Sequence, residues 1–174
     1  MDAELIETLN ENLEVTGVMP RSEVHEKGLL HAVVQLYIYQ KKGKKFMLYL
    51  QQRSNKKYSY PLKYDMSCAG HIDPGETPTQ AVIRETKEEI GIDLDESNLN
   101  YLGTFDNKRD KGSYIDNEIA HVFLYKVSET PNFAPGDEVE KIIVMADERY
   151  FDIATGIKEI NPAETLDGKN THIM

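Results

Sequence analysis

The chain has 174 residues, of which 40% are hydrophobic and 29% are charged, proportions typical of a globular protein with one core. Its 20 basic and 30 acidic residues give a formal net charge of −10 at pH 7, which argues against a nucleic acid polymer or an anionic membrane as partner. One cysteine and the lack of a signal peptide or long apolar run favour the cytoplasm. We expect a single domain with its core at about residues 25–155, a peripheral N-terminal arm (1–24) and a peripheral C-terminal tail (163–174).

The predicted elements are mainly strands. Apolar residues recur at roughly helical spacing within residues 2–19, which leaves an amphipathic helix and an extended arm as alternatives. Segments rich in β-branched and aromatic residues, or with alternating apolar residues, predict strands at 32–39, 46–53, 100–106, 118–127 and 139–145. Turns are expected at 41–45 and 107–116, a helix is expected to begin within 147–153, and the tail from Ala163 is expected to lack regular structure.

A basic and aromatic loop at residues 54–64 follows the second predicted strand. Its lysines can meet the charge of a phosphate, and a tyrosine ring can offer a stacking face. For each tyrosine, packing against the core is an equally open alternative. The residues that we interpret as candidates for substrate binding, at this loop and at a glycine beyond it, are Arg53, Lys57, Lys63, Tyr64 and Gly70.

Residues 77–91 carry the signals of a helix with defined ends. Thr77 is a good N-cap, Pro78 suits the first turn, and Gln80 stands where its side chain can close a capping box. Gly91 is a natural left-handed end. A helix is therefore predicted between Thr77 and Gly91.

This helix carries a cluster of carboxylates. Glu85 lies three and four residues before Glu88 and Glu89, so the three side chains share one side of the helix. Like charges repel one another unless a cation lies among them, and carboxylate oxygens suit Mg²⁺ or Mn²⁺. Glu76 could add a carboxylate at the helix entrance, and Arg84 could pair with one of the glutamates. From the charges alone, a solvated acidic face is the favoured alternative.

The full spacing of this segment resembles the signature of the Nudix hydrolases. The fixed positions that match are Gly70, Glu76, Arg84, Glu85, Glu88, Glu89 and Gly91. A chance match of these positions is on the order of one in a million at ordinary residue frequencies. Thr86 stands where the family usually has an aliphatic residue.

The resemblance implies a Nudix-type α/β/α sandwich with a mixed sheet, and metal-dependent hydrolysis of a diphosphate linkage in a nucleoside diphosphate derivative or similar small organic diphosphate. Mg²⁺ or Mn²⁺ is the implied cofactor. Glu85, Glu88 and Glu89 would hold it, with Glu76 and Glu118 as further ligands. Arg84 would orient the glutamates, and which glutamate acts as the base stays open. A homodimer is the expected assembly.

Within this family the chain resembles the branch of isopentenyl diphosphate isomerase. That likeness implies a second metal site, formed with Glu118 by His25, His31, His71 and Asp116. Taken singly, each histidine is more often explained as a hydrogen-bonded structural residue.

Three features argue against isomerisation. Ala69 occupies the position of the family's proton-transferring cysteine, and a one-residue shift in a strand turns Cys68 to the opposite face, where it is expected to be buried. The sequence has no tryptophan to steady a carbocation. The glutamates of the hydrolase motif are all present. A non-catalytic nucleotide-binding module is a further alternative.

Overall fold

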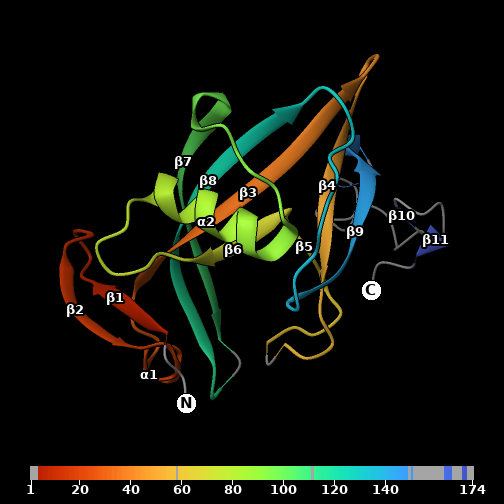
Figure 1. The fold of residues 1–174 in the computed structure, drawn as a ribbon. Coiled ribbons are helices and arrows are strands. Elements are labelled where there is room, and N and C mark those ends of the chain that lie inside the picture. Colours follow the sequence, from red (N-terminus) through yellow and green to blue (C-terminus); the bar gives the residue numbers. More distant parts are fainter. Residues whose placement is uncertain are drawn as a thin grey trace.

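The computed structural model describes residues 4–57, 59–110, 112–148, 150, 163–165 and 170–171. Within them, one mixed sheet is covered on one face by the longer helix, α2 (Figure 1). In chain order the elements are β1 (Leu5–Leu9), β2 (Val15–Pro20), α1 (Arg21–Lys27), β3 (His31–Lys42), β4 (Lys45–Arg53), β5 (Tyr64–Asp65), β6 (Cys68–His71), α2 (Pro78–Ile90), a 3₁₀ turn (Glu96–Asn98), β7 (Leu99–Asp110), β8 (Ile115–Val127), β9 (Val139–Ala146), β10 (Ala163–Thr165) and β11 (Asn170–Thr171). No helix in the described ranges has the length and apolar composition needed to cross a membrane.

Strand β3 is the centre of the sheet. It pairs antiparallel with β4 and β6, and parallel with β8 from His31 opposite Glu118 to Gln40 opposite Val127. At its start it meets β1 through the pair of Thr8 with His31. The predicted α/β class with a mixed sheet is therefore confirmed, and β3 connects the N-terminal hairpin to β4, β6 and β8.

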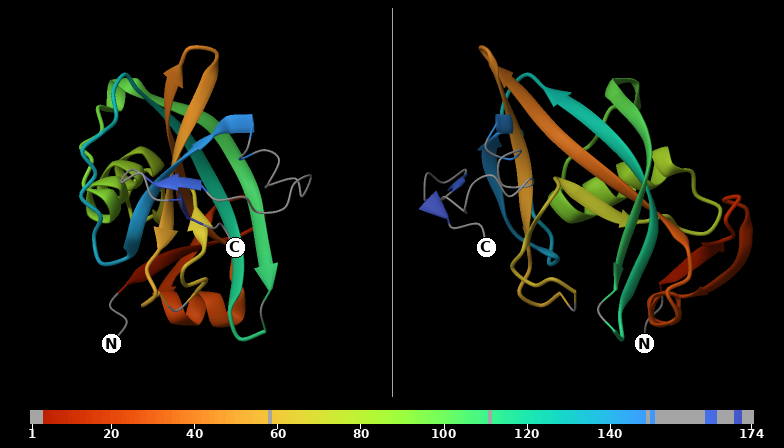
Figure 2. Two further views of the ribbon diagram at one scale, coloured as in Figure 1. Left: turned by 90° about the vertical axis from the view of Figure 1, so that its right-hand side faces the viewer. Right: turned by 180° about the vertical axis from the view of Figure 1, so that it is seen from behind.

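The two faces of β3 pack against different parts of the protein. Because successive side chains of a strand point to opposite faces, Val34, Leu36 and Ile38 are buried in the core under α2. Val33 and Tyr37 point to the other face, where they pack with residues of β8 and β9. The right-hand view of Figure 2 shows the sheet from the side away from α2, with β3 and β8 side by side. One face thus builds the main core, and the other is left to line a cavity.

Helix α2 has the ends that its sequence predicts. Thr77 Oγ1 accepts a hydrogen bond from Gln80 N at 3.3 Å, and Gln80 Oε1 accepts one from Thr77 N at 2.9 Å, which completes the capping box. Gly91 ends the helix with a φ of 71°. Thr86 is fully buried, and its hydroxyl donates to Val82 O at 2.6 Å, so its polar group is satisfied within the helix.

The N-terminal residues form an extended hairpin, not a helix. β1 and β2 pair antiparallel, and the side chain of Asn10 accepts hydrogen bonds from the N–H groups of Asn12 and Glu14 at the turn. The seven-residue helix α1 is not among the predicted elements. It follows Pro20 without a side-chain N-cap, so the usual start signal is missing from the sequence.

The charged turn predicted at 107–116 is wrong for most of its length. β7 continues to Asp110, and β8 already begins at Ile115. Cross-strand pairs explain why polar residues remain extended here. Arg109 lies opposite Asp116, and Asn107 lies opposite Glu118 and donates to its carboxylate at 2.6 Å.

The C-terminal expectations have a mixed outcome. Residues 147, 148 and 150 are helical, whereas the rest of the helix predicted at 147–153 lies outside the described residues. The tail does contain regular structure, because β10 pairs with β9 and β11 pairs with β10.

We expect Gly91→Ala to destabilise the protein more than Gly75→Ala. Both glycines have a positive φ, so both substitutions strain the backbone by about 1–2 kcal/mol. Only at Gly91 would the new Cβ also collide, 2.7 Å from the Cβ of Ala134, whereas Gly75 has open space. Chemical denaturation of the two variants measures the difference in unfolding free energy. Equal losses would show that Ala134 moves away from the new Cβ without a measurable cost.

Candidate active site

A cavity of about 1160 Å³ brings together most of the predicted site residues. It is lined by side chains from α1, β3, β6, α2 and β8 and from the loop at 54–64. The sequence-predicted residues that line it are Arg53, Lys57, Lys63, Tyr64, Gly70, His71, Arg84, Glu85, Glu88, Glu89, His25, Asp116 and Glu118. Glu76 and His31 are not among the lining residues, but Glu76 bonds to Arg84 and His31 packs against His71, and both of these partners line the cavity.

Three histidines and a glutamate converge at one end of the cavity. The ring centroids of His25, His31 and His71 lie 4.9 to 5.4 Å apart. One ligand atom from each ring and one carboxylate oxygen of Glu118 all lie within 4.8 Å of one another. They come from α1, β3, β6 and β8, so the sheet register assembles the cluster from distant parts of the sequence.

Each histidine ring is oriented by a hydrogen bond at Nδ1. His25 Nδ1 lies 2.9 Å from Arg21 O, and His31 Nδ1 lies 2.9 Å from Leu29 O. His71 Nδ1 lies 2.8 Å from Glu4 Oε1. Since all three partners are acceptors, Nδ1 carries the proton and Nε2 is left with its lone pair. This is the tautomer that a metal-binding imidazole needs.

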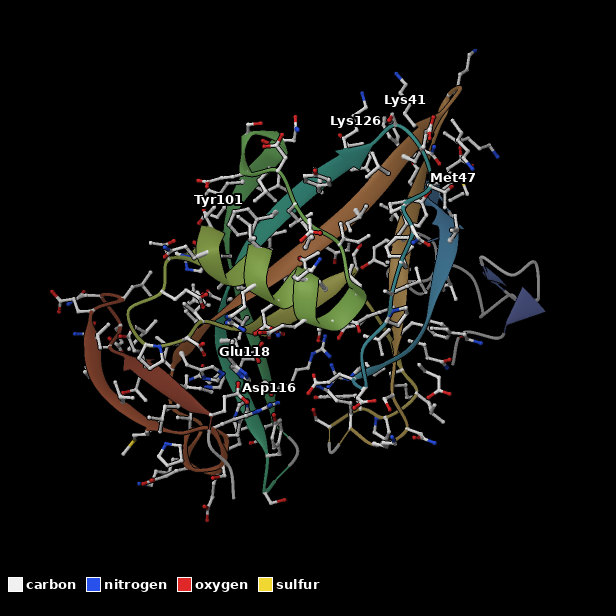
Figure 3. The ribbon with its side chains drawn as sticks, in the orientation of Figure 1. Lys41, Met47, Tyr101, Asp116, Glu118 and Lys126 are labelled. Carbon is white, nitrogen blue, oxygen red and sulfur yellow. The ribbon has the colours of Figure 1, made fainter. Side chains whose placement is uncertain are left out.

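Two carboxylates of β8 face these rings, and both extend from the strand below α2 in Figure 3. Asp116 Oδ1 lies 3.7 Å from His25 Nε2, and Glu118 Oε1 lies 3.9 Å from His31 Nε2. These separations are too long for hydrogen bonds. His31 Nε2 is buried and has no hydrogen-bond partner in the described part of the chain. A buried polar atom without a partner costs roughly 1–3 kcal/mol, so the cluster is chemically incomplete by itself.

Burial sets the charges of this cluster. It lowers the pKa of His25 and lowers the pKa of His31 to about 3, so His31 is neutral at pH 7. Burial, reinforced by the charge of Asp116, raises the pKa of Glu118 to about 7. Neutral imidazoles leave lone pairs for a cation, and a bound cation would favour the deprotonated form of Glu118, whose pKa is otherwise raised.

Arg84 organises the acidic end of α2. Its guanidinium donates to Glu76 at 2.8 and 3.1 Å and to Glu85 Oε1 at 2.8 Å, and it reaches Glu88 at 3.3 Å. A further N–H donates to the carbonyl of His71 at 3.0 Å. Burial alone would raise the pKa of Glu76, but the hydrogen bonds from Arg84 and the backbone lower it. One arginine thereby links the motif glutamates to the strand that carries His71.

Glu85 and Glu89 are the buried members of this carboxylate group. Burial raises the pKa of Glu85 to about 7, although the bonded Arg84 opposes the shift. Burial also raises the pKa of Glu89, whose Oε2 accepts hydrogen bonds from Gln51 at 2.9 Å and from Ala69 N at 3.2 Å. A Cβ at Gly70 would lie 2.1 Å from Cδ of Glu85. Glycine is therefore required at Gly70 for Glu85 to keep its place.

The predicted substrate-binding side chains differ in how they are engaged. Arg53 donates to the carbonyl of Ser59, and Lys57 pairs with Glu138. Lys63 has no side-chain partner among the residues that the structure describes. The hydroxyl of Tyr64 is buried, also without a described partner. Lys63 is the cation most readily available to an anionic ligand.

Sequence reasoning missed several residues of the site. Glu4 and Arg21 line the cavity from the N-terminal hairpin and α1. Asn107 and Gln51 hold Glu118 and Glu89 by hydrogen bonds. None of these residues belongs to the motif, and only the pairing of the strands shows that they reach it.

The positions of Cys68 and Ala69 agree with the sequence analysis. Cys68 is fully buried in the core under α2, and burial raises the pKa of its thiol. Ala69 points the other way and lines the cavity. No thiol in the described ranges therefore faces the candidate site.

The family model described as the NUDIX domain matches residues 29–162. The chain belongs to the Nudix family. Glu4, Arg21 and His25 lie before the matched residues. The signature glutamates and the cavity are thus features of a Nudix protein, and the N-terminal residues extend the site beyond the matched region.

Relatives of two kinds are similar to this Nudix chain. It is 36% identical over 125 residues to an uncharacterised Nudix hydrolase of Clostridium acetobutylicum, covering 72% of this chain and 60% of that protein's length. It is 34% identical over 131 residues to an isopentenyl-diphosphate Delta-isomerase of Pectobacterium atrosepticum, covering 75% of this chain and 70% of that protein. The relatives therefore include both reaction classes.

Solved structures share the fold. A crystal structure from Deinococcus radiodurans has a TM-score of 0.69 at 23% identity and covers 88% of this chain and 90% of its own. An Ap4A hydrolase from C. elegans in a binary complex has a TM-score of 0.54 at 26% identity and covers 71% of this chain and 85% of its own.

We expect His31 to stay neutral in the metal-free protein between about pH 8 and pH 4, because burial depresses its pKa to about 3. The unfolded chain takes up this proton near its ordinary pKa of 6.5. The contribution of His31 to the unfolding free energy is therefore complete above about pH 6.5, and it is lost as the pH falls toward 3. Long-range ¹H–¹⁵N NMR measures the protonation of Nε2. As the pH is lowered, the unfolding free energy of His31→Asn should fall less steeply than that of the native protein. Titration of His31 near pH 6.5 in the native protein would contradict this prediction.

Proposed function

We propose that this Nudix chain hydrolyses a diphosphate linkage in a nucleoside diphosphate derivative or similar small organic diphosphate, using divalent cations. The observation that carries the proposal is that both ligand sets, the motif glutamates and the histidine cluster, border one cavity. The similarity to an Ap4A hydrolase structure supports a nucleotide-containing substrate.

The histidine cluster fits a transition metal better than Mg²⁺. Its donors are three imidazole nitrogens and the carboxylate of Glu118, a set that suits Mn²⁺ or Zn²⁺. The unpartnered Nε2 of His31 is the structural sign of a missing ligand partner. The glutamates of α2 offer only oxygen atoms, which suit Mg²⁺ or Mn²⁺. We infer two chemically different cation sites in the same cavity.

Bound cations would neutralise the charge on the phosphates and lower the pKa of an attacking water. The protein's own side chains then have defined tasks. Arg84 holds Glu85 through Oε1, which leaves Oε2 to accept the proton of the water. Glu118 is the second candidate for this base, since Asn107 orients it and its pKa, like that of Glu85, is raised to about 7 without a cation.

The remaining cavity surface can bind the substrate. Lys63 is available to pair with a phosphate oxygen. The cavity-facing side chains of β3, Val33, Gln35 and Tyr37, lead away from the histidines to the pair of Tyr37 with Tyr150, whose hydroxyls lie 3.1 Å apart. The organic part of the substrate would lie along this half-apolar floor.

Isomerisation of isopentenyl diphosphate is the second candidate, because the histidine cluster is assembled and an isomerase is 34% identical. It is the less favoured candidate because the methyl group of Ala69 cannot transfer a proton at the cavity wall. Assay with isopentenyl diphosphate decides between them, since formation of the allylic isomer would establish the isomerase. If no diphosphate is converted, a binding module is the remaining alternative. The homodimer, the cytoplasmic location and the absence of a nucleic acid polymer as partner stay predictions.

Glu89→Gln should lower kcat/KM for diphosphate hydrolysis at least about a hundredfold, equivalent to roughly 2.7 kcal/mol of transition-state stabilisation. The amide keeps the shape of Glu89 and can still accept from Gln51 and Ala69 N, so the change removes one metal-binding charge. Phosphate release from a panel of diphosphates with Mg²⁺ or Mn²⁺, coupled to a phosphatase where needed, is the measurement.

The matched control is Glu96→Gln, which changes an exposed glutamate of the 3₁₀ turn. It should keep native activity, and both variants should melt as the native protein does or more stably. Native turnover by a folded Glu89→Gln protein would remove Glu89 from the catalytic group.

A further inference from the structure

The N-terminal hairpin reaches the histidine cluster through Glu4. This residue precedes β1, and its Oε1 accepts the Nδ1–H of His71 at 2.8 Å. The carboxylate thus supports the ring of His71 from the N-terminal end of the hairpin.

Arg21 ties Glu4 to a second histidine. Its Nη1 donates to Glu4 Oε2 at 2.8 Å, and its backbone N–H donates to the carbonyl of Glu4 at 3.0 Å. The carbonyl of Arg21 in turn accepts the Nδ1–H of His25. One ion pair thus connects the supports of two of the three histidines.

Such contacts decide whether a histidine can bind a cation. A partner on Nδ1 fixes the tautomer and the orientation of the ring, and it strengthens Nε2 as a donor. We propose that Glu4 is the positioning residue of His71 and that the Glu4–Arg21 pair makes the N-terminal hairpin part of the metal site. The inference rests on the proposed function, because it gives the histidine cluster a cation.

The N-terminal hairpin meets the rest of the protein at residues of the histidine cluster. Besides the Glu4–His71 contact, β1 meets the body of the protein where Thr8 pairs with His31, where Leu9 N–H donates to Leu30 O at 2.7 Å, and where Gly75 N–H donates to Glu7 Oε1 at 3.0 Å. His31 and His71 contact the hairpin and belong to the cluster. A cation bound by them favours the docked hairpin, since it binds the folded arrangement alone.

Glu7 provides a matched control for Glu4. Glu7→Ala removes a hairpin contact of the same residue type, but its partner is Gly75 and not a histidine. Glu4→Ala removes the acceptor of His71, and Glu4→Gln keeps an acceptor oxygen while removing the charge. Zn²⁺ affinity of the full-length proteins, measured by competition with a chelating dye, compares the three variants.

We expect Glu4→Ala to weaken Zn²⁺ binding about 10- to 100-fold, Glu4→Gln to lose less, and Glu7→Ala to stay near the native value. A native affinity in Glu4→Ala, or an equal loss in Glu7→Ala, would overturn the role of Glu4 while leaving the metal site in place. A native protein that takes up no Zn²⁺ would instead overturn the cation site, and with it the role of Glu4 in metal binding.

The tautomer of His71 gives a readout that needs no metal. Long-range ¹H–¹⁵N NMR of the metal-free native protein should show the proton on Nδ1 of His71. In Glu4→Ala the Nε2–H form should appear, whereas Glu7→Ala should keep the native pattern. An unchanged tautomer in Glu4→Ala would show that Glu4 does not orient the ring.

Discussion

The structure depends on the alternation of side chains along β3. Its inner face joins the core under α2, while its outer face begins at His31 and continues as the floor of the cavity. Because β6 and β8 both pair with β3, their registers place His71 beside Val33 and Glu118 beside His31. A one-residue slip of either strand would turn these ligands into the core. Strand pairing is therefore the constraint that assembles the site.

The same register decides which residue of β6 faces the cavity. Cys68 and Ala69 are adjacent on β6, so one is sealed in the core and the other faces the cavity. The carboxylates at this wall, Glu85 and Glu89, remain in place because Gly70 leaves room for the first and Ala69 N–H binds the second. At this wall of the cavity, the chain therefore has carboxylates that can bind cations and accept a proton, but it has no thiol that could donate one.

The sequence predicted those parts of the site that depend on local signals. Thr77 and Gly91 mark the ends of α2 through backbone geometry that short-range chemistry specifies, and the glutamate spacing identified the family motif. The histidines could be grouped only through a family resemblance, since their meeting depends on three strand registers. Glu4 was not predictable, because its partner His71 lies far along the chain and is reached only when the hairpin docks. Long-range pairing carries information that local patterns lack.

The buried imidazoles, the unpartnered Nε2 of His31 and the facing carboxyl of Glu118 form the cluster for which we propose a bound cation. The most direct test is an anomalous-scattering map of crystals grown with Mn²⁺. The account predicts an anomalous peak between the Nε2 atoms of His25, His31 and His71 and the carboxylate of Glu118. Crystals with Mn²⁺ elsewhere in the cavity but none at this cluster would contradict it.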